Sequence, residues 1–251
     1  MISIITPVYN GEKFIESCIK VVIDQKCPEV EHIIVDGGST DLTVEIINHY
    51  AENYSHIRWI SEKDQGQSDA MNKGVLAAKG EIIGILNVDD FYNYNVLNRI
   101  LEIFKTLPDP SFVVGNCNVL NEEDKIIHIN KPQNLNIIPI LLKQAPHPFN
   151  PSAYFYHKKL HEVIGLYDIN EHYVMDLDFI FKAIRGAEKV KYVDEIWGNY
   201  RSIEGTKTSL TKLNGQHTQL ANYIRKKHIK KLPLLQQCQV AYIYLLSKLK
   251  K

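Results

Sequence analysis

The chain has 251 residues, of which 45% are hydrophobic and 23% are charged, and its formal net charge is zero. These values are ordinary for a globular domain and exclude a disordered or fibrous chain, and no run approaches the roughly 20 apolar residues of a membrane-spanning helix. The four cysteines lie far apart without a CxxC pair, which argues against a zinc site or a disulfide framework and favours a reducing cytoplasm.

Strand-like and helix-like patterns alternate through the first half. Continuous apolar runs predict strands at residues 2–8, 32–35, 57–60, 82–86 and 112–119. Apolar residues at helical spacing predict helices over residues 14–22, 42–50 and 96–104, and Ser68 or Asp69 caps a further helix. Such alternation is typical of βαβ units, so we expect an α/β fold with a mostly parallel central sheet flanked by helices.

The second half is less regular. Five prolines between residues 131 and 152 predict a long irregular loop with a short helix near residues 137–143. Loops of this length inside a compact domain are usually functional or disordered. A helix over residues 176–185 follows, because Leu177, Ile180, Phe181 and Ile184 share one face.

The neutral total conceals a segregation of charge. Residues 205–251 contain ten lysines and arginines and no acid, so this tail carries a charge of +10 and the first 204 residues carry −10. The tail has the composition of basic amphipathic helices. Three alternatives stay open: it binds an anionic membrane surface, it folds back onto the acidic body, or it mediates self-association. Nucleic-acid binding is not expected, because no reader motif is present.

One apolar run ends abruptly in two adjacent carboxylates, Asp89 and Asp90. In open α/β sheets, ligands bind beyond the carboxyl ends of the strands. Two acids at that place can hold a divalent cation and, through it, a diphosphate. The alternative is that Asp90 caps a helix beginning near Asn93.

Polar clusters follow two other strands of the same half, at residues 6–10 and 36–41. Parallel strands place all three clusters at one edge of the sheet, which favours the ligand-binding interpretation of Asp89 and Asp90. Residues 64–74 form a polar loop that leads into a helix N-terminus, and such a terminus favours anions.

These motifs resemble those of family 2 glycosyltransferases. The resemblance is strong over residues 1–120, looser to about 210 and absent from the tail. It rests on four segments in the family's order and spacing: Thr6-Pro7-Val8-Tyr9-Asn10, Val35-Asp36-Gly37-Gly38-Ser39-Thr40-Asp41, Asp69-Ala70-Met71-Asn72-Lys73-Gly74 and Asn87-Val88-Asp89-Asp90. It implies a GT-A fold, a nucleotide-diphosphate sugar donor, a divalent metal (Mn²⁺ or Mg²⁺) and inversion at the anomeric carbon.

The resemblance also implies roles for single residues. Asp90 would bind the metal, which neutralises the charge that develops on the leaving diphosphate. Many relatives have a second acid, which contacts the nucleotide base, where this chain has Gly37, so another group must serve here. The implied nucleotide-sugar-binding residues are Thr6, Pro7, Tyr9 and Asp36 around the base and ribose, Asp89 at the ribose, and Asp69 and Asn72.

Direct displacement needs a base that takes a proton from the acceptor hydroxyl. In the family an acidic pair opens a helix and its Asp serves as this base. Asp176 takes that position, Met175 replaces the usual Glu, and Asp178 is the fallback. The alternative is that Asp176 is an ordinary helix N-cap.

Two later segments add weaker candidates. Arg201 and Lys207 lie in a segment that resembles the one that closes over the diphosphate in relatives, where either side chain could contact phosphate. The alternative is that this segment is a solvated basic loop. In the proline-rich loop, His147 and Asn150 are candidates for the acceptor pocket, as is Asp178. A lone histidine in a loop is more often plain surface.

We therefore expect a metal-dependent inverting glycosyltransferase that moves one sugar from a nucleotide-diphosphate sugar to a saccharide or lipid-linked saccharide acceptor, in bacterial surface polysaccharide biosynthesis. Residues 1–210 would form the GT-A domain, with a nucleotide-sugar-binding half (1–120) and an acceptor half (121–210), and residues 211–251 a basic helical tail. The expected location is the cytoplasm, with peripheral attachment to the inner face of the cell membrane left open. The rival is a non-catalytic protein that keeps the crevice for nucleotide-sugar binding or partner recruitment, which the Met175 and Gly37 departures favour.

Overall fold

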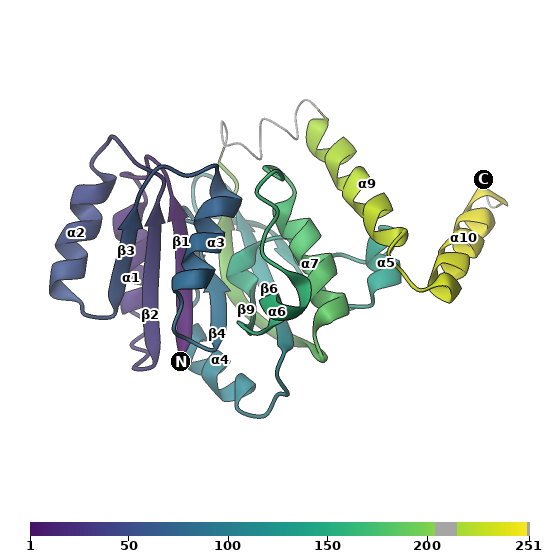
Figure 1. Cartoon of the computed structure of the whole chain (residues 1–251), viewed down its shortest axis with the longest axis horizontal. Coiled ribbons are helices and arrows are strands. Elements are labelled where there is room, and N and C mark those ends of the chain that lie inside the picture. The colour runs from purple at the N-terminus through teal and green to yellow at the C-terminus, as the bar shows by residue number, and fades with distance from the viewer. Residues whose placement is uncertain (204–214, 250–251) are drawn as a thin grey trace.

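The computed structural model describes residues 1–203 and 215–249, and within this part of the chain a single mixed sheet runs through the molecule (Figure 1). The strand order is β3-β2-β1-β4-β8-β6-β9-β5, with β7 paired to β6. The strands are β1 (Ile2–Val8), β2 (Val30–Asp36), β3 (Ile57–Ser61), β4 (Ile82–Ile85), β5 (Phe91–Tyr92), β6 (Ser111–Leu120), β7 (Ile126–Asn130), β8 (Tyr154–His157) and β9 (Lys189–Arg201).

The first four main strands are parallel, as expected from their continuous apolar runs. β1 pairs with both β2 and β4 in parallel, and β2 pairs with β3 in parallel. Beyond β4 the sheet becomes mixed, because β8 is antiparallel to both β4 and β6, whereas β6 and β9 are parallel. The mostly parallel α/β fold predicted from sequence is therefore confirmed in its N-terminal half, and β8 inserts an antiparallel strand at its centre.

Helices cover both faces of the sheet (Figure 1). They are α1 (Ile15–Ile23), α2 (Thr43–Asn53), α3 (Gln67–Ala77), α4 (Val96–Phe104), α5 (Ile137–Leu141), the 3₁₀ turn η1 (Pro151–Ala153), α6 (Leu160–Ile164), α7 (Met175–Gly186), α9 (Gln216–Ile229) and α10 (Leu234–Leu249). On one face Cys18 and Leu97 pack against Ile4 and Phe155. On the other face α3, α6 and α7 share a core with the sheet.

Two predicted caps are wrong. Asp90 does not cap a helix near Asn93, because β5 intervenes and α4 begins at Val96 after Asn95, which adopts a left-handed conformation. At α3, Gly66 with a φ of 110° occupies the N-cap position instead of Ser68 or Asp69. A residue without a side chain tolerates this backbone conformation.

The C-terminal helices differ in their packing. α9 buries Ala221 and Ile224 in a core shared with Leu177 and Phe181 of α7 and with Leu141 of α5. α10 extends from the end of α9 away from the sheet (Figure 1), and its Leu234 and Leu235 are 75% and 85% exposed. Within the described ranges, no helix is long and apolar enough to cross a membrane.

Candidate active site

The carboxyl ends of β1, β2 and β4 meet at one edge of the sheet. Val8 at the end of β1 lies opposite Asp36 at the end of β2, and the backbone N–H of Gly37 donates to the Val8 carbonyl at 2.9 Å. The loops beyond these strands are tied together, because the Asn10 N–H donates to Ser39 Oγ at 2.8 Å. The polar clusters that follow the strands are thus neighbours.

The acidic pair follows β4 at this edge. Asp90 is 1% exposed, and its Oδ2 accepts hydrogen bonds from the side-chain amides of Asn87 at 2.9 Å and Asn150 at 2.8 Å. Among the described residues, Asp90 Oδ1 accepts only one longer bond, at 3.3 Å, from the backbone N–H of Arg201. The end of β4, the proline-rich loop and the end of β9 therefore converge on one carboxylate.

The electrostatics of the pair fit a bound divalent cation. Burial and the charge of neighbouring Asp89 raise the pKa of Asp90 to about 8. Burial also raises the pKa of Asp89, against an opposing effect of Arg201. Two adjacent buried carboxylates resist ionising together unless a cation compensates them. Among the described residues no cluster of three or more potential protein ligands occurs.

A cavity of about 460 Å³ lies next to the acidic pair. Asn87 and Asn150, the two amides that hold Asp90, both line it. So does Asp176, from the first turn of α7. Asp89 and Asp90 do not line the cavity themselves, so it is through these two amides that the cavity borders the acidic pair.

Asp176 has the surroundings of a proton acceptor. Its Oδ1 is buried and has no hydrogen-bond partner among the described residues. Burial raises the pKa of Asp176 to about 6, against the opposing effect of the Tyr154 hydroxyl. A carboxylate with a raised pKa in a cavity is suited to accept a proton near neutral pH. The N-cap alternative is wrong, because Val174 occupies the N-cap position and no side-chain capping bond is made.

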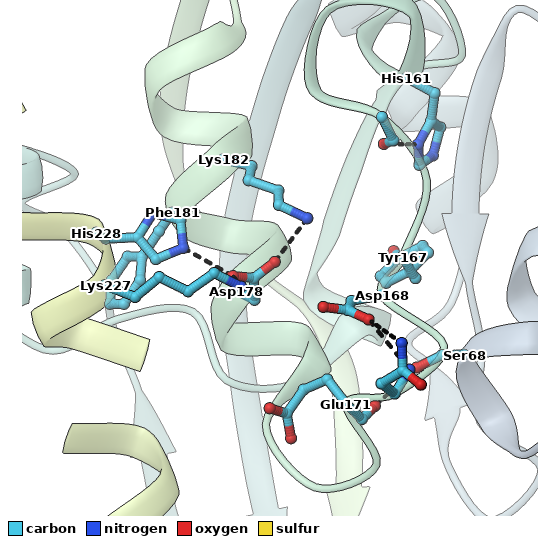
Figure 2. A network of polar contacts seen from close by, with 12 residues as sticks. Ser68, His161, Tyr167, Asp168, Glu171, Asp178, Phe181, Lys182, Lys227 and His228 are labelled. Atoms are coloured by element: carbon cyan, nitrogen blue, oxygen red, sulfur yellow. Dashed lines mark hydrogen bonds and ion pairs between the residues drawn. The ribbon is translucent and has the colours of Figure 1, made fainter. Parts of the chain in front are cut away.

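The fallback base, Asp178, lies elsewhere in the structure. It is buried between α7 and α9, where its carboxylate contacts Lys182 Nζ at 2.6 Å, His228 Nε2 at 2.9 Å and Lys227 Nζ at 3.5 Å (Figure 2). The bonds from His228 and Lys182 outweigh the effect of burial and hold the pKa of Asp178 well below its usual range. Asp178 does not line the cavity beside Asp176, so this arrangement makes it an anchor for α9 and contradicts its assignment as a base or acceptor residue.

Three of the expected donor residues differ in their accessibility. Tyr9, directly after β1, is 64% exposed and free to meet a ligand, and Pro7 lies one position before the end of the strand. Asp36 is fully buried, and its carboxylate accepts bonds from the N–H groups of Gly38 and Ser39 and, at 2.6 Å, from Ser61 Oγ. The position of Asp36 is thus fixed by the loop it anchors.

Two other expected donor residues are occupied within the protein. Thr6 is fully buried, and its hydroxyl pairs with His32 Nε2 at 2.9 Å. Asn72 exchanges two hydrogen bonds of 2.9 Å with the backbone of Tyr167, which fixes the loop before α7. Both side chains are thus engaged within the protein, and a contact of Thr6 or Asn72 with a nucleotide stays a prediction.

The remaining expected donor residues are charged. Asp69 forms an ion pair with Lys73 at 3.3 Å. Arg201 stacks over the Phe91 ring at 4.6 Å from its centroid, and its Nη1 donates to the Asp89 carbonyl at 3.0 Å. This places a guanidinium beside the acidic pair, and its Nε also pairs with Asp124 Oδ1 at 2.8 Å. Lys207 lies outside the described residues.

A carboxylate that sequence reasoning missed lies where Gly37 leaves space. A Cβ built on Gly37 would lie 2.6 Å from Asp64 Oδ2. Asp64 comes from the loop between β3 and α3, and its Oδ1 accepts a 2.8 Å bond from the Gly66 N–H. The acid that is absent from position 37 is therefore replaced in space by Asp64. The Asp64-Gln65-Gly66 segment was visible in the sequence as a polar loop, but its proximity to Gly37 depends on the tertiary fold.

The acceptor candidates from the proline-rich loop both reach the cavity. His147 lines it, and burial and the nearby charges of Arg225 and His217 lower the pKa of His147 to about 4. Asn150 lines it too while holding Asp90. The α9 residues Thr218, Ala221 and Arg225 also line this cavity and were not predicted. Their helical spacing places them on one face, but the sequence does not show that this face packs against the body.

The comparison with known families places this geometry in context. The family model described as "Glycosyl transferase family 2" matches residues 3–164. This match covers more than half of the chain, so the chain belongs to glycosyl transferase family 2.

The curated relatives share this family name or activity. The chain is 30% identical over 220 residues to "Uncharacterized glycosyltransferase EpsJ" of Bacillus subtilis (strain 168), covering 84% of this chain and 63% of the relative. It is 25% identical over 251 residues to "PGL/p-HBAD biosynthesis glycosyltransferase" of Mycobacterium bovis (strain BCG / Pasteur 1173P2), covering 99% of this chain and 90% of the relative. The chain thus spans less than two thirds of the length of EpsJ.

Solved structures support the fold. S. aureus TarS in complex with UDP-GlcNAc superposes with a TM-score of 0.72 at 18% identity, covering 97% of this chain and 71% of that one. The mannosyltransferase PcManGT from Pyrobaculum calidifontis, in complex with GDP-Man and Mn²⁺, gives a TM-score of 0.59 at 16% identity, covering 98% and 80%. The expected GT-A fold is therefore confirmed.

Proposed function

We propose that the protein is an inverting glycosyltransferase that moves one sugar from a nucleotide-diphosphate sugar to a saccharide or lipid-linked saccharide. The observation that carries the proposal is the single cavity lined by Asp176 and by the two amides that hold Asp90. Family membership and the nucleotide sugars bound to TarS and PcManGT support it. A place in bacterial surface polysaccharide biosynthesis is part of the proposal and rests on family usage.

The reaction follows from the positions of the side chains. Asp176 Oδ1 accepts the proton of an acceptor hydroxyl, whose oxygen attacks the anomeric carbon of the donor. The bond from that carbon to the diphosphate oxygen breaks, and the configuration inverts. A divalent cation held by Asp90 would neutralise charge on the diphosphate, and Arg201 beside the pair supplies a further positive charge.

On the donor side, Asp64 would contact the nucleotide base in place of the acid that relatives have where this chain has Gly37. Its carboxylate lies at the place a side chain at position 37 would occupy, close to the polar ends of β1 and β2. A carboxylate there accepts a hydrogen bond from an N–H group of the nucleotide base.

The test uses donor hydrolysis and transfer with UDP-GlcNAc and GDP-mannose as probes, with Mn²⁺ or Mg²⁺. We expect Asp176→Asn to lower turnover by about 100-fold or more while nucleotide affinity stays unchanged, and Asp90→Ala to abolish stimulation by metal. Glu188→Gln, at an exposed acid beyond the other end of α7, is the matched control. An unchanged rate in Asp176→Asn would contradict its role as the base.

The same assay separates the enzyme from the rival binding protein. A non-catalytic protein would bind nucleotide and release no sugar. Met175, the first residue of α7, is 6% exposed and packs in the core. It favours that rival because it stands where the family usually has a Glu. Release of sugar that depends on Asp176 would exclude the rival.

A further inference from the structure

A second cavity adjoins the first, and two cations line both. The second cavity, of about 520 Å³, is lined by residues that follow or belong to α5, α9 and α10. Lys143, after α5, and Arg225, in α9, line this cavity as well as the cavity of Asp176. Any molecule that extends from one cavity into the other passes these two side chains.

Arg225 is buried, and no counter-charge pairs with it in the described part of the chain. Its side chain is 8% exposed, and Nε is buried with no hydrogen-bond partner in the described part of the chain. Its Nη1 makes a long 3.4 Å bond to the carbonyl of Ala221, and its Cζ lies 6.0 Å from the centroid of the Phe181 ring. Burial lowers the pKa of Arg225, with no acid acting against it.

Of the described residues that line the two cavities, Asp176 is the one acid, and no ion pair joins it to Arg225 in the described structure. Residues 125–161, which include α5 and the proline-rich loop, contain no Asp or Glu, and neither do residues 205–251, which include α9 and α10. On α7, Asp178 is paired with Lys182, Lys227 and His228. A buried guanidinium without an anion is costly, and its planar fork matches a phosphate. The positive charge of Arg225 is therefore not balanced by an anion of the described protein. A ligand with a phosphate group can balance it.

The two cavities differ in their chemistry. The first holds the candidate base Asp176 and the amide of Asn150. Beyond Lys143 and Arg225, the lining of the second combines polar Gln144, Asn222, Lys226 and Tyr244 with a group of aliphatic side chains from three segments: Leu141, Leu142, Ile229, Val240 and Ile243. A ligand that fills both is polar at one end, anionic in the middle and apolar at the other end.

We infer that the acceptor is a saccharide joined through phosphate to a lipid. The sugar lies at Asp176, the phosphate at Arg225 and Lys143, and the start of the hydrocarbon chain in the second cavity. This inference rests on the proposed function and narrows its acceptor to the lipid-linked class. α10, whose Val240 and Ile243 line the second cavity, also exposes Leu234, Leu235, Tyr242 and Leu245 to solvent, and exposed apolar side chains on a helix suit contact with the bilayer in which such an acceptor resides.

The inference is tested by calorimetric titration of the full chain with three probes: decyl phosphate and decyl glucoside, both below their micelle concentrations, and inorganic phosphate. We expect decyl phosphate to bind at least tenfold more tightly than either of the others, because only it supplies both the anion and the chain. Arg225→Gln should weaken decyl phosphate binding by about tenfold or more. Ile243→Asn, which makes the second cavity polar without adding a charge, should weaken decyl phosphate binding but leave the binding of inorganic phosphate unchanged.

Controls make the result independent of folding and of the proposed function. Lys230→Gln removes an exposed positive charge just after α9 that lines neither cavity, and should bind decyl phosphate like the unsubstituted protein. Arg225→Lys keeps the charge in case Arg225→Gln does not fold. UDP binding, measured on the same samples, tests the donor site separately. Equal affinity for decyl phosphate and decyl glucoside, or no effect of either Arg225 substitution, would overturn the inference.

Discussion

Asp176 and Asp178 are two residues apart on one helix, yet their environments give them opposite properties. Asp176 Oδ1 lacks a partner in the described structure, and burial raises the pKa of Asp176 to about 6. Asp178 is only 2% exposed, but His228 and Lys182 hold its pKa well below the usual range. Successive helical positions that differ by two lie on different faces, so one carboxylate meets the cavity and the other meets α9.

This contrast predicts opposite effects on stability. Because the pKa of Asp176 is raised, its ionised form destabilises the fold above pH 6, and Asp176→Asn should raise the free energy of unfolding at pH 7.5 by up to about 3 kcal/mol. Asp178→Asn should lower it by about 3 kcal/mol, because it leaves the charges of Lys182 and Lys227 unpaired. The contribution of Asp178 is present above about pH 4 and is lost as the pH falls further. Urea titrations at pH 7.5 measure the change in the free energy of unfolding for both variants. Changes of the same sign would contradict the opposite environments assigned to Asp176 and Asp178.

The raised pKa also predicts a pH profile. If Asp176 is the base, kcat/KM should be level above pH 6 and fall about tenfold per unit below it, because protonated Asp176 accepts no proton. His147 does not supply this transition, since its pKa is lowered to about 4. The measurement is donor turnover from pH 5 to pH 8 at saturating metal. The residual activity of Asp176→Asn should not fall below pH 6 in this way. If the fall persists in that variant, another group is responsible for it.

The replacement of position 37 by Asp64 predicts a defect in nucleotide binding. Asp64→Asn should weaken UDP binding by about tenfold, because the amide presents a donor where the base requires an acceptor. Glu62→Gln is the control, as this acid on the same loop pairs with Lys73 at 2.9 Å. Isothermal titration with UDP measures both variants. An unchanged affinity in Asp64→Asn would leave base recognition to the main chain.

At the scale of elements, the sequence predicted those whose pattern is local. Local pattern was sufficient to predict the strands β1 and β4 from their apolar runs and the helices α1 and α4 from their helical spacing. Each of these strands is buried along its whole length, and each of these helices buries one face. β8 was not predicted: it has four residues and follows a proline-rich loop, and it is a strand because β4 and β6 flank it. The gathering of strand ends followed from parallel order alone, whereas the bonds of Thr6 and Asn72 depend on partners far along the chain.

At the scale of the whole molecule, the basic tail divides into two parts with different roles. The alternative in which it folds onto the acidic body holds for α9, which is fixed by Asp178 and by a shared core. A boundary near residue 210 stays a prediction, but it does not separate α9 from the core of the body. The sequence could not show this, because the pair of His228 with Asp178 joins positions 50 residues apart. Attachment to a membrane is then a proposal for α10 alone.

Removal of the two helices separately should therefore have different effects. Deletion of residues 234–251 removes the exposed leucines and tyrosines of α10, and we expect it to abolish flotation with vesicles of anionic lipid while UDP binding changes little. The melting temperature should fall less than in the longer deletion, because α10 contributes only Val240 to the buried core that α7 and α9 share. Deletion of residues 215–251 also removes α9, and should lower the melting temperature by several degrees or more, because Leu177, Phe181 and Asp178 lose their cover. Flotation and thermal unfolding of the two truncated chains measure these effects. Equal flotation of the full chain and of the chain without α10 would exclude that helix as the membrane contact.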